Sequence, residues 1–481
     1  SADTKGHRSV AIGQGTLATQ NFTSSTNSYN TAVGFQAGNA VTTGTLNTFI
    51  GALSGDAVTT GGQNTALGQN SLGSNTTASN NTAIGYVALV ANTTGASNVA
   101  VGASSLDANT EGSNNTGVGF NALTSNTTAA GNTAVGYNSL AANTTGASNT
   151  AVGSGALDAS TTGASNVAVG LNSMTSNTNG YENTAVGKDS LASCTEGFEN
   201  TAIGHNCGAA ITTGDNNTFV GNAAGQANTT AGANTAVGNA ALASNTTGAT
   251  NNAFGANALD ACTTGARNNG FGYRALASAT TGYYNTAIGH QAGDDITDGF
   301  KNICIGHDAD ISAGNNQHTI VIGESITAAS NDFSFGKASN VVTNDFDTDA
   351  NWSRSSDERL KKNITNQTLG LDFINDLRTV KYNWKASNEL DSTDAELSHL
   401  YKEDAADNEM NTSAVMHNFI AQEVKAALDT AGVSEFGGWK EDQYGVQQVS
   451  REMFVIPLVK AVQELSTKLD AALARITTLE G

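Results

Sequence analysis

The sequence predicts a mainly β fold, in which a trimeric β-solenoid shaft of 17-residue repeats precedes a small α+β domain that ends in a long helix. Three observations predict this fold. A glycine recurs every 17 residues, a β-branched tripeptide precedes it, and both features stop before a charged C-terminal segment. We divide the chain into an N-terminal segment with one atypical repeat (1–29), the shaft (30–326), a degraded coil and linker (327–355) and the C-terminal domain (356–481).

The repeat is unbroken over eighteen units. Its glycine, called the key glycine below, stands at 34, 51, 68, 85, 102, 119, 136, 153, 170, 187, 204, 221, 238, 255, 272, 289, 306 and 323. Asparagine lies four residues before it, at position −4, in seventeen units, and an earlier relative, Ser9–Gly13, is offset by a four-residue insertion. Units interrupted twice by glycine cannot hold a helix pair, so we expect two or three short strands per coil, stacked in register.

The repeat residues predict how the coils pack. The fixed asparagine predicts a left-handed corner whose amide is hydrogen-bonded from coil to coil. In Asn98–Gly102 the valines face one way and Ala100 the other, and the alanine side is small in nearly all units, which favours a strand buried on both faces. Leucine four residues after the key glycine, as at Leu106, adds a second apolar contact. Because aromatic residues make up only 6% of the chain, one thin coil would have a poor core, and this predicts a homotrimer.

Composition excludes several partners. Residues 1–351 carry 7 Lys+Arg against 21 Asp+Glu, and residues 352–481 carry 14 against 21. We therefore expect no nucleic-acid partner, which would require a basic patch. No segment has the ~20 apolar residues of a membrane helix, so we expect no membrane insertion, and no signal peptide is visible at Ser1. We interpret the four cysteines as reduced, because no CxxC pair suggests zinc and no geometry suggests a disulfide. They are Cys194, Cys207, Cys262 and Cys304.

Two polar clusters late in the shaft are candidate sites. His205, His290 and His307 directly follow key glycines, and the last two lie in neighbouring coils about 5 Å apart. The same position holds Phe, Tyr, Asn or Lys in other units, so we expect no metal there. Calcium binding or glycosidase chemistry is the alternative for an acidic cluster, but a solvated surface is the simpler interpretation, and we expect no cofactor. This cluster comprises Asp294, Asp295, Asp298, Asp308 and Asp310.

Four motifs follow one another in the C-terminal segment. They are Ser356-Asp357-Glu358-Arg359-Leu360-Lys361-Lys362-Asn363-Ile364, Val380-Lys381-Tyr382-Asn383-Trp384, Phe419-Ile420-Ala421-Gln422-Glu423-Val424 and Ile456–Leu465. In order and spacing they resemble the intramolecular chaperone domain at the end of phage endosialidases and tail fibres, the S74 peptidase family. The repeats before them resemble the head repeats of trimeric autotransporter adhesins, although adhesin coils are usually shorter.

The resemblance to the S74 family implies a self-cleaving serine endopeptidase. The domain would help three chains to trimerise and fold, and would then cut the bond between Ser355 and Ser356. The resemblance implies Ser356 as nucleophile and Lys361 as general base, a role that requires burial or a cationic neighbour. An offset of five places these residues on different sides of a helix or strand, so the dyad needs a turn or a neighbouring subunit. Without the resemblance, Ser356 and Glu358 would be interpreted as part of a helix cap.

The last segment has apolar residues at alternating spacings of three and four. They are Val455, Leu458, Val462, Leu465, Leu469, Ala472, Ile476 and Leu479. These positions predict a trimeric coiled coil over 455–481, with an amphipathic helix packed on the domain core as the alternative. Pro457 fits the first turn of this helix.

Together the shaft and the resemblance predict a phage tail fibre or appendage, made in the host cytoplasm and located in the virion. The expected partners are two further copies of the chain, an unidentified host-surface receptor and other virion tail proteins. A cellular trimeric adhesin is one alternative, and it would carry a secretion signal and an outer-membrane barrel. A glycan-degrading tailspike is another, and it would carry a domain rich in carboxylates and aromatic residues. An ice-binding rod would need a continuous Thr-x-Thr face, which the repeats lack.

Overall fold

The computed structural model describes residues 6–345, 353–354, 358–403, 412–413 and 415–480. The chain forms two compact units, Ser1–Ser355 and Ser356–Gly481, and each is described by itself. None of the helices in the described ranges is both long enough and apolar enough to cross a lipid bilayer.

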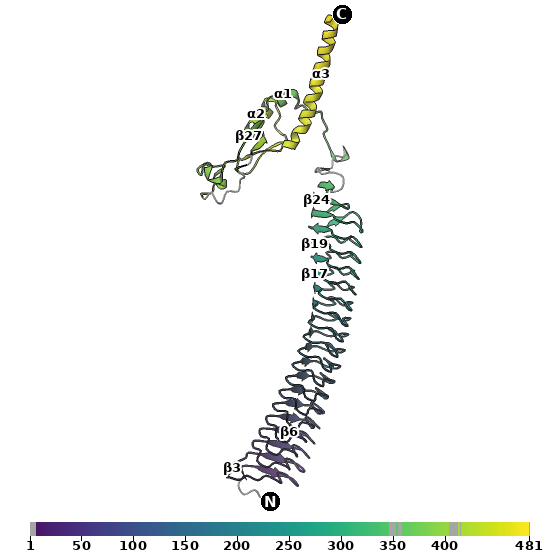
Figure 1. Cartoon of the computed structure of the whole chain (residues 1–481), viewed down its shortest axis with the longest axis vertical. Helices are drawn as coiled ribbons and strands as arrows, with labels where there is room; N and C mark the ends of the chain where they lie inside the picture. Colours follow the sequence, from purple (N-terminus) through teal and green to yellow (C-terminus); the bar gives the residue numbers. More distant parts are fainter. Residues whose placement is uncertain (1–5, 346–352, 355–357, 404–411, 414, 481) are drawn as a thin grey trace. The chain divides into compact units, whose positions relative to one another are not determined.

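The first unit is a β-solenoid (Figure 1). Each coil contributes a three-residue strand that pairs in parallel with the strand 17 residues further on, as Thr133 does with Thr150. The regular strands are β4 (Thr31–Val33), β5 (Thr48–Ile50), β6 (Thr65–Leu67), β7 (Thr82–Ile84), β8 (Val99–Val101), β9 (Thr116–Val118), β10 (Thr133–Val135), β11 (Thr150–Val152), β12 (Val167–Val169), β13 (Thr184–Val186), β14 (Thr201–Ile203), β15 (Thr218–Val220), β16 (Thr235–Val237), β17 (Asn252–Phe254), β18 (Asn269–Phe271), β19 (Thr286–Ile288) and β20 (Ile303–Ile305). This confirms the predicted solenoid and its register.

The two ends of the solenoid depart from the repeat. At the start, β2 (Val10–Ile12) pairs with β4 across the predicted insertion, and β1 (Gly6–His7) pairs with β3 (Thr26–Asn27). At the far end, β20 pairs with β22 (Ile320–Glu324), which pairs with β24 (Asp332–Lys337). The chain then turns back into antiparallel β25 (Asn340–Asp345) and β26 (Ser353–Arg354), while β21 (Ala309–Ile311) pairs with β23 (Ile326–Ala328). The outer edge of β24 is thus paired with β25 of the same chain. An open edge there could pair with a strand of another chain.

Each regular coil has one strand rather than the two or three that we expected. Residues in the left-handed conformation break the extended chain at three places per coil, for example Ser97 (φ 60°), Ser104 (55°) and Leu106 (53°). Backbone hydrogen bonds still continue from coil to coil through these corners, as from Leu106 N to Ala122 O (2.9 Å). The hydrogen-bond ladder therefore extends beyond the short strand on one side.

The asparagine ladder is confirmed, but the asparagine itself is not left-handed. Asn98 N donates to Oδ1 of Asn81 (2.9 Å), and Asn98 Nδ2 donates to Gly112 O (2.8 Å). The left-handed residue is the preceding one, Ser97 in this coil. The extended backbone at the asparagine directs its amide inward, where it satisfies buried backbone groups that would cost about 1–3 kcal/mol if left unpaired.

The period of 17 is enforced by the key glycine. Gly102 has φ +135°, and a Cβ built there would lie 2.3 Å from Gly119 O in the next coil. Larger residues at this position would push neighbouring coils apart and break the ladder.

A single chain encloses its own core, contrary to the expectation that one coil would pack poorly. The central strand residue and the leucine after the key glycine are fully buried, as at Ala100 and Leu106 (0% exposed). Phe49 replaces the alanine in one coil, and there Gly55 stands in place of the leucine; a Cβ on Gly55 would lie 2.5 Å from the Phe49 ring. Phe219 and Gly225 form the same pair, and glycine also holds the leucine position in the coil before each phenylalanine, at Gly38 and Gly208, so two coils together accommodate the ring.

The second unit is a small α+β domain. Its elements are η1 (Glu358–Leu360), α1 (Leu371–Asn375), β27 (Val380–Tyr382), η2 (Ser387–Glu389), η3 (Ser398–Leu400), β28 (Met416–Asn418), α2 (Ala421–Thr430), β29 (Trp439–Glu441), β30 (Gln447–Val449), η5 (Arg451–Phe454) and α3 (Val455–Glu480). The strands form two antiparallel pairs, β27 with β28 and β29 with β30. Phe373, Val424, Leu428 and Phe454 are buried at its centre. Glu464 on α3 accepts a hydrogen bond from Leu371 N (2.8 Å), which joins α3 to the start of α1.

Candidate functional site

The predicted cleavage site is described only in part. Ser355 and Ser356 lie outside the described residues. Of the three predicted site residues, the structure therefore places only Lys361. Lys361 follows the turn η1, where its backbone N donates to Glu358 O (3.0 Å). In the described part of the chain a turn thus immediately precedes Lys361.

The surroundings of Lys361 are open to solvent. Its side chain is exposed, as are those of Arg359 and Lys362. A lysine becomes an effective general base when burial or a cationic neighbour favours its neutral form. In one chain the described residues do not bury Lys361, so they do not supply the burial that a lysine general base would need.

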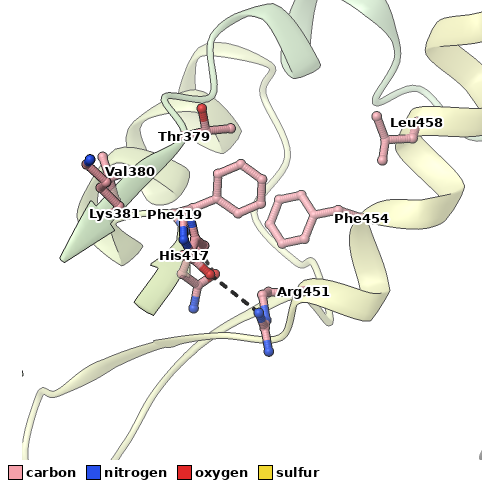
Figure 2. Close-up of a pocket in the computed structure, with 9 residues that line it drawn as sticks. Thr379, Val380, Lys381, His417, Phe419, Arg451, Phe454 and Leu458 are labelled. Atoms are coloured by element: carbon pink, nitrogen blue, oxygen red, sulfur yellow. Dashed lines mark hydrogen bonds between the residues drawn. The ribbon is translucent and has the colours of Figure 1, made fainter. Parts of the chain in front are cut away.

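The structure brings the other three motifs to one groove (Figure 2). Val380 comes from the second motif, Phe419 from the third and Leu458 from the fourth, and all three line a groove of about 510 Å³. The ring centroids of Phe419 and Phe454 lie 4.9 Å apart. Arg451 Nη1 donates to His417 O (3.4 Å). Sequence reasoning ordered these motifs but did not foresee that they meet.

A second groove, of about 760 Å³, lies beside the β27–β28 pair and also contacts Phe419. Tyr382 and Trp384 of the second motif pack edge to face across it, with ring centroids 5.3 Å apart. Its apolar lining includes three leucines, Leu390, Leu397 and Leu400.

The heptad face of α3 is exposed in the single chain. Only Pro457 and Ala461 are buried among the described residues of this helix. Leu465 is 55% exposed and Leu469 58% exposed. The alternative of an amphipathic helix packed along the domain core holds only for the first turns of α3, where Leu458 lines a groove with Phe419 and Phe454, while the later part of the apolar stripe is exposed.

The strand residue directly before each key glycine forms an apolar column on the outside of the shaft. We call this set the outer column. It comprises Val33, Ile50, Leu67, Ile84, Val101, Val118, Val135, Val152, Val169, Val186, Ile203, Val220, Val237, Phe254, Phe271, Ile288, Ile305 and Ile322. None of these side chains is buried, and none is charged. In the single chain one face of the strand is covered and the other is half-open, so the burial of both faces that we expected is present on one side only.

The outer column is unusual for a surface. A soluble monomer rarely exposes a long contiguous apolar patch, and such patches mark interfaces. Here apolar residues lie in parallel register on consecutive coils, and Phe254 stacks on Phe271 with ring centroids 4.9 Å apart. The signal was present in the sequence: strand residues alternate between faces, so small inward residues leave the flanking valines outside.

The acidic cluster is not simply a solvated surface. Asp310 occupies the core position that leucine holds in other coils, and it is 5% exposed. Its Oδ2 accepts from Asp295 N (2.9 Å) and its Oδ1 from Ile311 N (2.7 Å). Burial raises the pKa of the Asp310 carboxyl to about 7. Since both oxygens are occupied by backbone donors, Asp310 has a structural role at the end of the shaft.

The predicted histidine stack is confirmed. The rings of His290 and His307 lie 5.0 Å apart and within 8° of parallel. Tyr273 continues the stack on the other side of His290, at 5.2 Å. His205 lies in the same column but faces Asn222, whose Nδ2 is 3.1 Å from His205 Nδ1.

The cysteines are free, as predicted, and the structure places all four in the core, fully buried. Burial raises the pKa of Cys194 to about 11 and those of Cys207 and Cys262 to about 12, and it raises the pKa of Cys304 as well. Buried thiols with raised pKa values are poor nucleophiles, so we assign them a packing role.

Comparison with known proteins identifies the C-terminal domain. A family model described as chaperone of endosialidase matches residues 356–433. The match starts at the predicted cleavage motif and spans the first three motifs, while the fourth lies beyond it. No curated protein and no solved structure matched the chain. The chain thus carries a β-solenoid shaft followed in sequence by an endosialidase-type chaperone domain.

Proposed function

We propose that this protein is a homotrimeric phage tail fibre or appendage for host-surface attachment. Its C-terminal domain directs trimer assembly and then severs the chain between Ser355 and Ser356. One observation carries the proposal: the shaft and α3 each expose a long apolar stripe that the single chain leaves uncovered. A parallel trimer covers both stripes with the same symmetry.

The outer column suits a three-fold axis. Its residues and those two positions earlier, mostly threonine, carry no charge in any of the eighteen units. Covering the exposed remainder of one column side chain yields about 1 kcal/mol, so a whole column yields on the order of 20 kcal/mol per chain. This exceeds the roughly 4–15 kcal/mol lost in rigid-body freedom on association. The net negative charge of the shaft then lies away from the axis.

The C-terminal domain suits an assembly device. The exposed heptad positions of α3 have the spacing that two further helices would cover in a coiled coil. Lys361 is exposed in one chain, so a neighbouring subunit that excludes water from it would activate the base only after assembly. The order of events is then trimerisation, folding of the shaft and cleavage.

The shaft itself has a structural and attachment role in this proposal. Aspartate recurs five residues after the key glycine in five of the eighteen units, but these five lie two or more coils apart, so no pair of opposed carboxylates is repeated at this position. The exposed stacks, such as Tyr181 on Phe198 at 5.0 Å, turn ring faces toward each other and leave edges outside. Glycan-degrading sites need opposed carboxylates and free ring faces, which favours attachment over degradation.

Expression of the full chain tests this proposal. Wild type should yield a separate 356–481 fragment on denaturing gels, and Ser356→Ala should remain one band. Lys361→Ala should also stay intact while still forming trimers, and the matched control Lys362→Ala should be cut normally. Cleavage of the Ser356→Ala chain at the same bond would refute the assigned nucleophile. Loss of trimers with Lys361→Ala would make that lysine structural rather than catalytic.

A further inference from the structure

Near the end of the shaft, three potential metal ligands from two neighbouring coils lie together. Their candidate ligand atoms, from His290, His307 and Asp308, all lie within 4.8 Å of one another. We propose that these residues form a binding site for a divalent transition-metal ion of the zinc type, which fastens the two coils. Sequence reasoning weighed the two histidines without their third ligand, which is Asp308.

Asp308 lies near the Nδ1 atoms of both stacked rings. Its Oδ2 lies 3.2 Å from His307 Nδ1, and its Oδ1 lies 3.9 Å from His290 Nδ1. Asp308 takes a left-handed conformation (φ 48°), and its backbone N donates to His290 O (3.0 Å). The backbone of one coil thus anchors the carboxylate against the histidine of the coil before it.

An unsatisfied carboxylate oxygen favours the binding of a cation here. Asp308 Oδ1 is buried and has no hydrogen-bond partner, although the rest of the side chain is partly exposed. A buried carboxylate oxygen without a donor is costly, and a bound cation would satisfy it. His290 Nδ1, 3.9 Å from this oxygen, is too distant for a hydrogen bond.

The spacing suits metal bonds of about 2.0–2.2 Å, which place tetrahedral ligand atoms roughly 3.3 Å apart. The distance of 3.2 Å between His307 Nδ1 and Asp308 Oδ2 already matches this value. The distance of 3.9 Å between His290 Nδ1 and Asp308 Oδ1 must shorten slightly when the ion binds. The stacked rings must tilt to aim both nitrogens at one ion. His290 and His307 side chains are 47% and 55% exposed, so rotation about their outer torsions is unobstructed by the core.

The ligand types select the class of ion. Two imidazoles and one carboxylate suit zinc and neighbouring transition metals, and leave a fourth position for water. Calcium and magnesium prefer oxygen-only sites, so they should bind weakly here. Close by, Glu324 pairs with Lys337 (3.0 Å) and is therefore already engaged. Tyr273 stacks on the outer face of His290 and supports the ring without competing for the ion.

The shaft offers conservative variants for the test. Phenylalanine and tyrosine occur naturally in the histidine column, so His290→Phe and His307→Phe keep the stack and remove a ligand. Asp308→Asn keeps the side-chain shape and removes the charge. The matched control is His205→Phe, which changes a histidine in the same column that faces Asn222 rather than a second histidine or a carboxylate.

The measurement is calorimetric titration of the full chain with zinc chloride at about pH 7.5, combined with metal analysis after dialysis. We expect one zinc per chain, binding weakened at least about tenfold by each of the three ligand variants, and no change with His205→Phe. Zinc should also raise the thermal midpoint of wild type and not of His290→Phe. Binding unaltered by these variants, absence of saturable binding, or one zinc per three chains would each overturn the intrachain site.

Discussion

Two carboxylates placed in the outer column should prevent the shaft from trimerising. Val118 and Val135 lie in adjacent coils, and their side chains are only partly buried in one chain. In a single chain, Val118→Asp with Val135→Asp loses about 1 kcal/mol of apolar burial per site. In a trimer, each substitution places three like charges around one axis.

The magnitude of the effect follows from Coulomb's law. Carboxylates about 6 Å apart at an effective dielectric constant of about 20 repel by roughly 3 kcal/mol per pair. Three pairs in each of two coils give about 16 kcal/mol per trimer, and removing the six carboxylates from water adds several kcal/mol for each. The sum is comparable with the roughly 60 kcal/mol that three columns contribute per trimer, once the loss of rigid-body freedom on association is subtracted. We therefore expect loss of trimers rather than a small decrease in stability.

The matched control places the same charges in the same coils but off the column. Asn121→Asp with Asn138→Asp uses a repeat position that holds aspartate naturally at Asp189. Native mass by light scattering should show trimers for the control and smaller species for the Val118/Val135 variant. A Val118/Val135 variant that trimerises and melts like the control would refute the outer column as the interface.

Two further predictions concern stability. Ala134→Phe should lower the free energy of unfolding by more than about 2 kcal/mol through overpacking, and adding Leu123→Gly and Leu140→Gly should recover most of that loss, as in the natural Phe49 and Phe219 coils. Thermal midpoints check this, and an equally unstable triple variant would contradict the volume-conservation argument. Asp310 is protonated in the folded shaft up to about pH 7 but only up to about 3.8 when unfolded, so its contribution is full below about pH 4 and is lost as pH rises to 7. The loss of stability is at most on the order of 4 kcal/mol. The thermal midpoint of Asp310→Asn should therefore change less than that of wild type between about pH 5 and pH 8. An equal change in both proteins would show that the Asp310 carboxyl is not the cause of the pH dependence.

The sequence was sufficient to predict the solenoid because one residue type fixes the coil length. Glycine alone fits where Gly102 meets the next coil, so the period is visible without any structure. The asparagine ladder was predictable for a similar reason, since a buried amide at a constant position needs constant partners. The corners were misplaced because left-handed φ values occur at serine, leucine and many other residues, so residue type does not mark them.

The candidate sites depended on long-range geometry and were less predictable. The apolar pattern of the outer column is visible in the sequence. Its exposure is evident only from the structure, in which each regular coil has a single strand. The groove that joins Val380, Phe419 and Leu458 depends on the β27–β28 pairing and the start of α3, which no local pattern specifies. Asp308 directly follows His307 but was assigned to the acidic cluster, because only the side-chain geometry shows its carboxylate beside both histidine rings.

The central claim is that three copies assemble through stripes that one copy leaves open. Native mass of the purified full-length Ser356→Ala chain, measured by light scattering, tests it most directly. The account predicts a particle three times the subunit mass of 48.7 kDa. A folded, soluble particle of one subunit mass would contradict it.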